Sequence, residues 1–386
     1  MHSIDQENIT NKRVLLRVDY NVSLLPNHHI ADDLRIRQSL PTIEYLLKKK
    51  NAIILISHLG RPHGVEEKYS LEPVLQRLKA YLPDVKIRFA RTIKELQDMT
   101  AEKPADITLL ENIRFYEGED RNSAKFAQEL AVLGDVYVND AFGVSHRACA
   151  TITKLPTLLP SYAGLLLAHE VNTINEIMNK SSKPFVTIQG GAKISDKIKL
   201  LSTLIEKSDY LLLGGGIANT FLKALGNEIG NSLHEPSELD SAKALLRKAE
   251  RERTKVLLPI DVITGSLNGD HETLKDVHAL TKHDRILDIG PATQAVFAQA
   301  ILQAKTIIWN GPVGLHEIPA YAKGTDFIFY AISANTEAMS IVGGGDTLAA
   351  LKNLEHLDKI THLSTGGGAL LSFIENGTLP GIDALK

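Results

Sequence analysis

The sequence predicts an α/β protein with two doubly wound parallel-sheet (Rossmann-like) domains joined by a hinge helix. Three observations lead to this prediction. Short apolar runs alternate with amphipathic helical patterns along the whole chain, nearly every run in the second half ends in glycine, and 386 residues exceed what one hydrophobic core usually supports. Buried parallel strands have continuous apolar runs of this kind, so each half is expected to form its own sheet.

Strands and helices alternate in the order expected for parallel sheets. In the first half we predict strands at 14–18, 53–56, 107–110 and 136–138, and helices at 39–50 and 123–133. In the second half we predict strands at 185–188, 210–213, 255–258, 286–289, 306–309 and 341–342. A helix predicted at 163–179 carries the hinge, and residues 180–184 have the composition of a linker. The predicted domains are therefore 1–165 and 185–369, with 166–184 as hinge helix and linker.

The composition is that of an ordinary globular protein, with 44% hydrophobic residues, 23% charged residues and a net charge of −3. This charge argues against a general nucleic-acid binder, so any basic site must be local. The single cysteine, Cys149, excludes an intrachain disulfide and is interpreted as a packing residue rather than a nucleophile. No apolar run approaches the roughly 18 residues that span a bilayer. We expect a cytoplasmic protein with neither nucleic-acid nor membrane partners.

Arginine and histidine recur at the strand ends of the first half, where ligands of open parallel sheets gather. The residues at these strand ends are Asp19, Asn21, Arg35, His58, Leu59, Gly60, Arg61, Arg114, His146 and Arg147. Because a planar guanidinium group suits phosphate and carboxylate, several convergent arginines predict a small polyanionic substrate. A separate surface ion pair is the alternative for any one arginine. A structural role is the alternative for His58, and it is the preferred interpretation for His146.

Glycine lines the strand ends of the second half, at 190–191, 214–216, 290, 311, 314, 343–345 and 366–368. Glycine lets the backbone approach a nucleotide base or a phosphate closely. Lys193 and Lys197 are spaced i and i+4 at a predicted helix start, so we expect both on one face, with solvated helix charges as the alternative. These features predict a nucleotide site in the second half.

The stretch from Ile341 to Leu351 is the main candidate for phosphate binding. Two β-branched residues, three glycines and Asp346-Thr347 before an apolar run predict a strand-to-helix turn. Backbone N–H groups at a helix N-terminus bind phosphate, and the Asp346 carboxylate is suited to Mg²⁺.

Several known signatures are absent. The chain has no Gly-Lys dipeptide, which excludes a Walker P-loop, and it has no complete Gly-x-Gly-x-x-Gly, His-Glu-x-x-His or Gly-x-Ser-x-Gly. A polyanion site on one domain facing a nucleotide site on the other predicts a phosphoryl-transfer enzyme that excludes water, with the active site in the interdomain cleft. The alternatives are a nucleotide-dependent binding protein without turnover and a hydride-transfer enzyme.

Nine ordered motifs between Arg13 and about Gly381 resemble those of phosphoglycerate kinases. They lie at 17–22, 57–62, 110–115, 140–147, 190–197, 214–222, 309–314, 343–347 and 364–369. The resemblance implies reversible phosphoryl transfer between ATP and the carboxylate of 3-phosphoglycerate, giving ADP and 1,3-bisphosphoglycerate, in glycolysis and gluconeogenesis. It also implies that residues from about 370 to 386 return to the N-terminal domain. We expect a monomer whose partners are these small molecules.

The resemblance assigns site residues to each domain. In the N-terminal domain the residues implied to bind 3-phosphoglycerate are Asp19, Asn21, Arg35, His58, Leu59, Gly60, Arg61, Arg114 and Arg147. In the C-terminal domain the residues implied to bind ATP or ADP are Gly191, Lys193, Lys197, Gly215, Pro312, Glu317, Gly343, Gly344, Gly345, Asp346 and Thr347. Glu317 is implied to contact the ribose, and Asp346 is implied to hold Mg²⁺.

The acceptor carboxylate is already ionised at pH 7, so the reaction needs no general base. Catalysis is expected to depend on alignment and on charge neutralisation. The groups expected to supply them are Arg35, Lys193, Lys197 and the helix N-terminus at Gly367 and Gly368. Arg35 is expected in a loop before a helix that begins near Ser39. Departures from the family pattern at Ser23, His316 and 166–170 are expected to affect rigidity and the hinge rather than activity.

Overall fold

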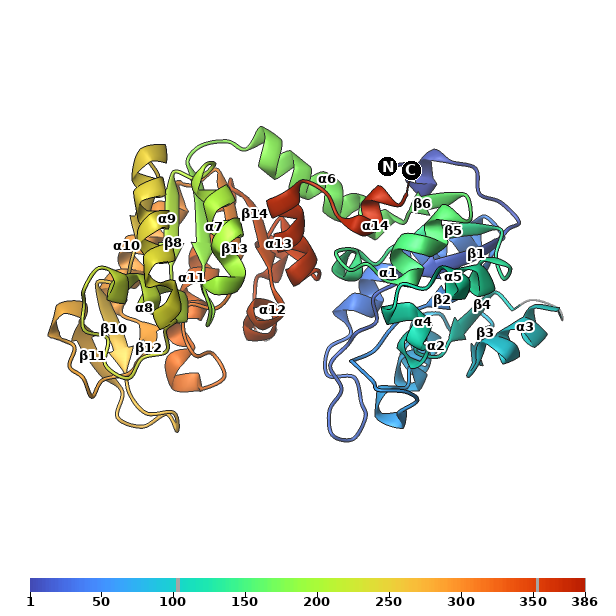
Figure 1. Cartoon of the computed structure of the whole chain (residues 1–386), viewed down its shortest axis with the longest axis horizontal. Coiled ribbons are helices and arrows are strands. Elements are labelled where there is room, and N and C mark those ends of the chain that lie inside the picture. The colour runs from blue at the N-terminus through green and yellow to red at the C-terminus, as the bar shows by residue number, and fades with distance from the viewer. Residues whose placement is uncertain (102–104, 352–353, 386) are drawn as a thin grey trace. The chain divides into compact units, whose positions relative to one another are not determined.

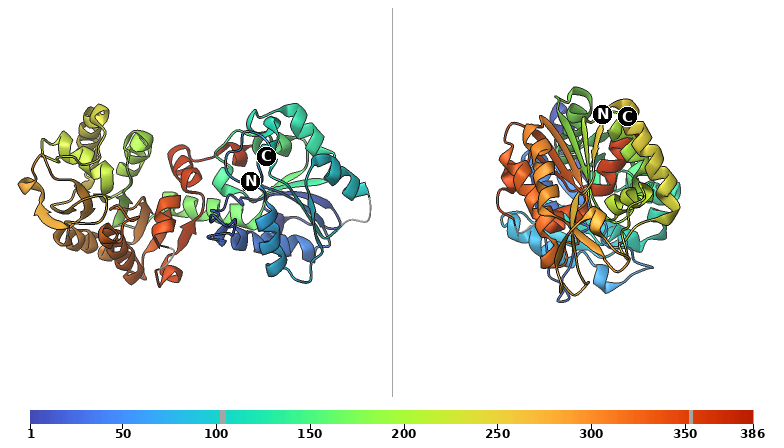
Figure 2. Two further views of the ribbon diagram at one scale, coloured as in Figure 1. Left: turned by 90° about the horizontal axis from the view of Figure 1, so that it is seen from below. Right: turned by 90° about the vertical axis from the view of Figure 1, so that its left-hand side faces the viewer.

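The chain divides into two compact units in the computed structural model, which describes residues 1–101, 105–351 and 354–385. Unit 1 comprises Met1–Asn172 and Asn376–Lys386, and unit 2 comprises Thr173–Glu375. The first division falls within helix α6 (Leu165–Lys180), and the second falls at the end of α13 (Gly367–Asn376). Helix α14 (Pro380–Asp383) therefore lies on the same unit as the first residues of the chain (Figure 1 and Figure 2), where the Gly381 N–H donates to the Ser145 carbonyl at 2.9 Å.

Unit 1 is built on a six-stranded sheet in the order β3-β4-β2-β1-β5-β6, with every neighbouring pair parallel. Its strands are β1 (Arg13–Arg17), β2 (Ala52–Ile56), β3 (Ile87–Ala90), β4 (Ile107–Leu110), β5 (Val136–Asn139) and β6 (Ser161–Ala163). The four strands predicted here are confirmed. Two further strands were not predicted. These are β3, whose central residues are only half-buried, and β6, which has three residues.

Helices cover the sheet of unit 1 because successive side chains of each strand point to opposite faces. Val14 and Leu16 of β1 pack in one cluster with buried residues of α1 (Leu34–Lys48) and α2 (Glu72–Tyr81). The remaining helices of this unit are α3 (Ile93–Ala101), α4 (Glu117–Asp120) and α5 (Ala124–Ala131). Helix α1 begins earlier than predicted, because the Asp32 carboxylate accepts a hydrogen bond from the Leu34 N–H at 2.9 Å and the helix starts there. Arg35 therefore lies in the first turn of α1, and its predicted place in a loop is wrong.

Unit 2 contains a second six-stranded parallel sheet, in the order β15-β14-β13-β7-β8-β9. Its strands are β7 (Phe185–Gln189), β8 (Tyr210–Leu213), β9 (Lys255–Leu257), β13 (Thr306–Asn310), β14 (Met339–Gly343) and β15 (His362–Ser364). A separate antiparallel sheet contains β10 (Asp261–Thr264), β11 (Thr273–Asp276) and β12 (Ile286–Ile289). Figure 1 shows it at the edge of unit 2. The parallel placement predicted for 286–289 is wrong, because an apolar run does not specify the direction of its neighbour.

The two faces of the large sheet in unit 2 carry different helices. Leu212 of β8 belongs to one cluster, with α10 (Pro291–Gln303) and α11 (Lys323–Ala334). Its neighbours Leu211 and Leu213 belong to another, with α7 (Ile198–Ile205), α8 (Gly215–Ala224) and α9 (Leu239–Glu252). Helices on both faces of a parallel sheet confirm the predicted doubly wound fold. In the part of the chain that the structure describes, no helix is long and apolar enough to cross a bilayer.

Candidate active site

The end of β1 in unit 1 brings Asp19, Asn21 and Arg35 together. The Arg35 guanidinium lies 3.2 Å from the Asp19 carboxylate and donates to the Asn21 carbonyl at 2.9 Å. The Asn21 side-chain oxygen accepts from the Gly60 N–H at 2.8 Å. These contacts connect the loops after β1 and β2 to the first turn of α1, so predicted site residues from three segments meet at one place.

Burial and neighbouring charges together keep Asp19 ionised and His58 neutral. Burial raises the pKa of Asp19, but the positive charges around it, that of Arg35 foremost, outweigh burial and lower the pKa to about 2. Burial lowers the pKa of His58 well below its ordinary value. The charge of Asp19 acts to raise this pKa, but the charges of Arg17 and Arg114 add to the lowering. The Arg17 guanidinium lies 3.3 Å from His58 Nδ1, and arginine can only donate. His58 is therefore neutral with its proton on Nε2, which makes it a hydrogen-bond donor there.

Three of the predicted arginines line one cavity of about 520 Å³ in unit 1, and these are Arg61, Arg114 and Arg147. Arg61 and Arg147 are exposed, whereas Arg114 is buried, donates to the Gly60 carbonyl at 2.7 Å and lies 3.3 Å from the Asp120 carboxylate. Three guanidinium groups around a cavity of this size suit a small phosphorylated molecule.

Two residues near this cavity have structural surroundings. Leu59 is buried in the core, and its carbonyl accepts from Asn112 Nδ2 at 2.7 Å, so its side chain does not line the cavity. Cys149 lines the cavity but is itself buried, and burial raises the pKa of its thiol to about 12. It stays protonated at neutral pH, as a packing residue would.

Bare backbone from three strand ends meets in unit 2. The Gly191 N–H donates to the Pro312 carbonyl at 2.9 Å, and the Gly215 N–H donates to the Val313 carbonyl at 3.0 Å. Gly215 has a φ of +62°, and a Cβ atom there would lie 2.8 Å from the Gly191 carbonyl oxygen. Only glycine satisfies both restrictions, so this surface is formed by main-chain atoms.

A pocket of about 180 Å³ opens beside this backbone surface. The predicted residues that line it are Gly191, Gly215, Pro312, Glu317 and Asp346. Further apolar residues that no sequence motif marked also line the pocket, and these are Leu233, Pro259, Ile286, Leu287, Ile289 and Leu315. They come from loops and a strand that carry no recognisable motif. His316, one of the departures from the family pattern, also lines the pocket and lies 3.4 Å from the Glu317 carboxylate. Apolar side chains beside flat backbone suit a planar base.

The two predicted lysines do not share a helix face. Lys193 is exposed in a loop, whereas Lys197 ends the 3₁₀ turn Ser195–Lys197, which precedes α7. The Glu235 carboxylate accepts from the Ser195 N–H and hydroxyl at 3.0 and 2.7 Å, which holds the loop out of the helix. The expected i, i+4 arrangement is therefore wrong. Lys197 Nζ donates to the Gly190 carbonyl at 3.1 Å. Burial lowers the pKa of Lys197, although the nearby negative charge of Asp346 acts to raise it.

The predicted strand-to-helix turn at 341–351 is confirmed, with β14 ending at Gly343 and α12 (Gly345–Leu351) following. Thr347 is buried, and its hydroxyl accepts from the Gly311 N–H at 2.8 Å, so it connects α12 to the loop after β13. A Cβ atom on Gly367 would lie 2.9 Å from the Gly344 Cα. The N-terminus of α13, with Gly367 and Gly368, therefore packs closely against this turn.

Asp346 fits a magnesium ion that a nucleotide carries. Its carboxylate is exposed at the start of α12 and lines the pocket beside Pro312 and Gly191. Across residues 1–101, 105–351 and 354–385 no group of three or more His, Cys, Asp or Glu side chains could hold a metal. Mg²⁺ usually takes one or two carboxylates together with substrate phosphates and waters, so a single carboxylate beside a phosphate site is an appropriate donor.

Comparisons with known proteins show which proteins this chain resembles. A family model described as phosphoglycerate kinase matches residues 4–377. The chain is 46% identical to a phosphoglycerate kinase of Dictyoglomus turgidum over 98% of this chain and 97% of that protein. It is 43% identical to one of Thermus thermophilus over 97% of each. The structure of phosphoglycerate kinase from Coxiella burnetii matches 99% of this chain and 98% of its own with a TM-score of 0.87 and 41% identity. The structure of phosphoglycerate kinase from Pyrococcus horikoshii matches 100% of this chain over 98% of the Pyrococcus chain, with a TM-score of 0.85 and 28% identity.

Proposed function

The chain belongs to the phosphoglycerate kinase family, and on this basis we propose how its residues divide the work of phosphoryl transfer. The reaction is reversible transfer between ATP and the carboxylate of 3-phosphoglycerate, giving ADP and 1,3-bisphosphoglycerate. The observation that carries the division is the contrast between an arginine-lined cavity in unit 1 and a glycine-walled pocket in unit 2.

We assign the 3-phosphoglycerate site to unit 1. Arg61, Arg114 and Arg147 bind the phosphate, because their guanidinium groups line the one cavity. Asp19 is ionised and accepts from the substrate hydroxyl, while His58 donates from Nε2. Asn21 and the backbone at Leu59 and Gly60 hold the loop that carries these groups.

We assign the nucleotide site to unit 2. The base lies on the backbone at Gly191 and Gly215 and against Pro312, and Glu317 binds the ribose. The phosphates lie at the glycine turn 343–345, with Lys193 and Lys197 as cationic partners and Thr347 holding the turn in place. Asp346 holds Mg²⁺, which when bound neutralises charge on the phosphates.

Catalysis needs no proton transfer, because the acceptor carboxylate is ionised at neutral pH. Arg35 neutralises charge on the transferring group from the acceptor side, and Lys197 does so from the nucleotide side. The N-terminus of α13 at Gly367 and Gly368 adds backbone N–H groups and the helix dipole. Because one chain carries both half-sites, we also propose that the protein acts as a monomer, in the cytoplasm, where glycolysis supplies its substrate.

A coupled assay of ADP release tests the proposal. ADP should appear only when ATP, Mg²⁺ and 3-phosphoglycerate are all present, and the same protein should give no NADH signal with a dinucleotide and a reducible substrate. ADP release that does not depend on 3-phosphoglycerate would overturn the substrate assignment. Binding of both ligands without turnover would favour a nucleotide-dependent binding protein.

A further inference from the structure

Asp33, just before α1, connects the first turn of that helix to α2. Its carboxylate accepts from the Tyr81 hydroxyl at 2.6 Å and from Arg37 Nε at 2.9 Å, and it lies 3.4 Å from the Arg77 guanidinium. Arg77 and Tyr81 are four residues apart on α2, so both face the same way. One carboxylate therefore joins two turns of α2 to the start of α1.

The Asp33 side chain does not cap its own helix. The Leu34 N–H is satisfied by Asp32, and Asp33 makes no side-chain cap hydrogen bond. Partial burial raises the pKa of Asp33, but the hydrogen bonds from Tyr81 and Arg37 and the charge of Arg77 outweigh it and lower the pKa. Asp33 is thus ionised at neutral pH, and its charge serves the contact between the helices.

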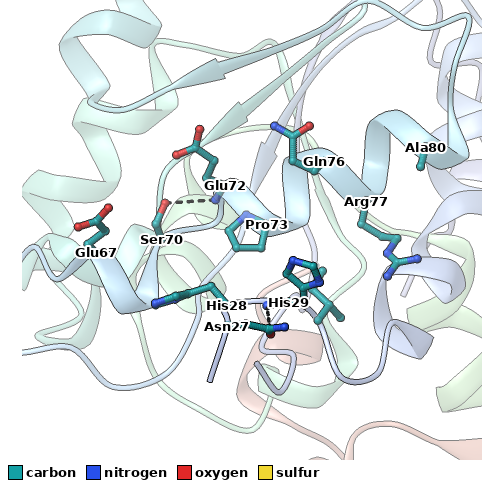
Figure 3. Close-up of a pocket in the computed structure, with 11 residues that line it drawn as sticks. Asn27, His28, His29, Glu67, Ser70, Glu72, Pro73, Gln76, Arg77 and Ala80 are labelled. Carbon is teal, nitrogen blue, oxygen red and sulfur yellow. Dashed lines mark hydrogen bonds between the residues drawn. The ribbon is translucent and has the colours of Figure 1, made fainter. Parts of the chain in front are cut away.

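The loop that leads into α1 leaves a hollow against α2. Asn27, His28, His29 and Ile30 face α2 along most of its length across a cavity of about 630 Å³. Figure 3 shows the labelled side chains of the two segments on either side of it. Arg77 lines this cavity and also pairs with Asp33. Because the loop does not close onto α2 here, the start of α1 is fixed to α2 by the Asp33 contacts together with the packing of Ile36 in the core.

Arg35 lies two residues after Asp33, in the turn that these contacts fix. Its guanidinium reaches the Asp19 carboxylate and the Asn21 carbonyl from that turn. A shift of the turn would move the guanidinium away from both groups. A misplacement of about 1 Å can cost on the order of 100-fold in rate.

We propose that Asp33, held by Tyr81 and Arg77, is a positioning residue for Arg35 in phosphoryl transfer. The inference deepens the proposed function and rests on the role assigned there to Arg35. It predicts that loss of the Asp33 contacts lowers kcat through Arg35 and leaves KM for 3-phosphoglycerate nearly unchanged.

The test is a double-mutant cycle on the full-length protein. We expect Asp33→Ala to lower kcat about 10-fold to 100-fold, and Tyr81→Phe, which removes only the hydroxyl, to lower it by a smaller factor. In the Arg35→Ala background both substitutions should change kcat by less than about twofold, because they act through the same group. Tyr45→Phe removes a hydroxyl from α1 away from its first turn and should leave kcat unchanged.

The outcomes separate this inference from the proposed function. Suppose that Arg35→Ala lowers kcat. If Asp33→Ala or Tyr81→Phe then lowers kcat by the same factor in the Arg35→Ala background as in the wild type, Asp33 is only structural and the inference is overturned. If Tyr81→Phe and Asp33→Ala both leave kcat at the wild-type value in folded protein, it is overturned as well. An Arg35→Ala variant with wild-type kcat would overturn the proposed role of Arg35, and this inference with it.

Discussion

Buried carboxyl groups at the proposed substrate site of unit 1 and the proposed nucleotide site of unit 2 have pKa values shifted in opposite directions. In unit 1 the arginines around Asp19 lower its pKa to about 2 although burial acts to raise it. In unit 2 the buried Asp288, which lines the pocket, has its pKa raised to about 7 by burial, although it accepts hydrogen bonds from the Gly324 and Ile289 N–H groups. Asp140 of unit 1, whose shift includes no arginine charge, also has a raised pKa of about 6.

The difference indicates that nearby guanidinium charge lowers the pKa of a buried carboxyl group, whereas backbone N–H groups do not offset burial at Asp288 or Asp140. A site made of side-chain charge suits a fully ionised small acid. A site made of backbone suits a ligand with a large neutral part and a phosphate tail whose charge Mg²⁺ partly neutralises.

The largest effect is expected for Arg35, the arginine assigned to the transferring group. Arg35→Ala should lower kcat about 10³-fold or more and change KM for 3-phosphoglycerate much less, because its charge is needed in the transition state. Arg35→Lys should recover only part of the rate, since an ammonium group lacks the planar fork. Steady-state kinetics on variants shown to be folded by circular dichroism would measure this. A raised KM with wild-type kcat would make Arg35 a binding residue.

The next largest effect is expected for Asp346 in unit 2. Asp346→Asn should weaken ADP binding about 10-fold to 100-fold in the presence of Mg²⁺ and much less in EDTA, because a neutral amide is a poor ligand for a hard cation. Calorimetric titration under both conditions measures the difference. Equal losses with and without Mg²⁺ would count against a metal role.

A backbone-built site should be sensitive to a single methyl group. Gly215→Ala should destabilise the protein by about 1–3 kcal/mol more than Gly226→Ala, because both positions have positive φ but only Gly215 has a backbone oxygen 2.8 Å from the added Cβ. The matched control, Gly226, has no atom within 4 Å of the added carbon. Urea unfolding of both variants measures the difference, and equal losses would show that steric contact at Gly215 is unimportant.

The smallest expected effect is a pH dependence with opposite signs in the two units. Asp288 binds its proton more tightly when folded, so the stability of wild type relative to Asp288→Asn should fall by about 1–2 kcal/mol as the pH rises from 5 to 7. Asp19 contributes stability above its ordinary pKa and loses it as the pH falls towards 2. Urea unfolding at several pH values measures the first dependence. A pH-independent difference between wild type and Asp288→Asn would show that Asp288 is ionised throughout.

The sequence was sufficient for the features that depend on local pattern. Continuous apolar runs predicted the parallel strands, and the residues that follow them include the three arginines of one cavity and the glycines of the other. Features that depend on distant partners could not be predicted. The direction of β12 is set by β10, and the loop position of Lys193 is set by Glu235. Arg17 was part of a recognised motif, but its burial beside Glu119 and Thr151 gave no local signal.

The division of ligands between the two units is tested most directly by calorimetry on two variants of the full-length protein. Arg114→Ala should weaken 3-phosphoglycerate binding about 10-fold to 100-fold, because a guanidinium group assigned to its phosphate is lost, and should leave Mg-ADP binding unchanged. Gly215→Ala, in protein shown to be folded, should weaken Mg-ADP binding and leave 3-phosphoglycerate binding unchanged. If either variant lost both ligands to the same extent, or lost the ligand assigned to the other unit, the division would be wrong.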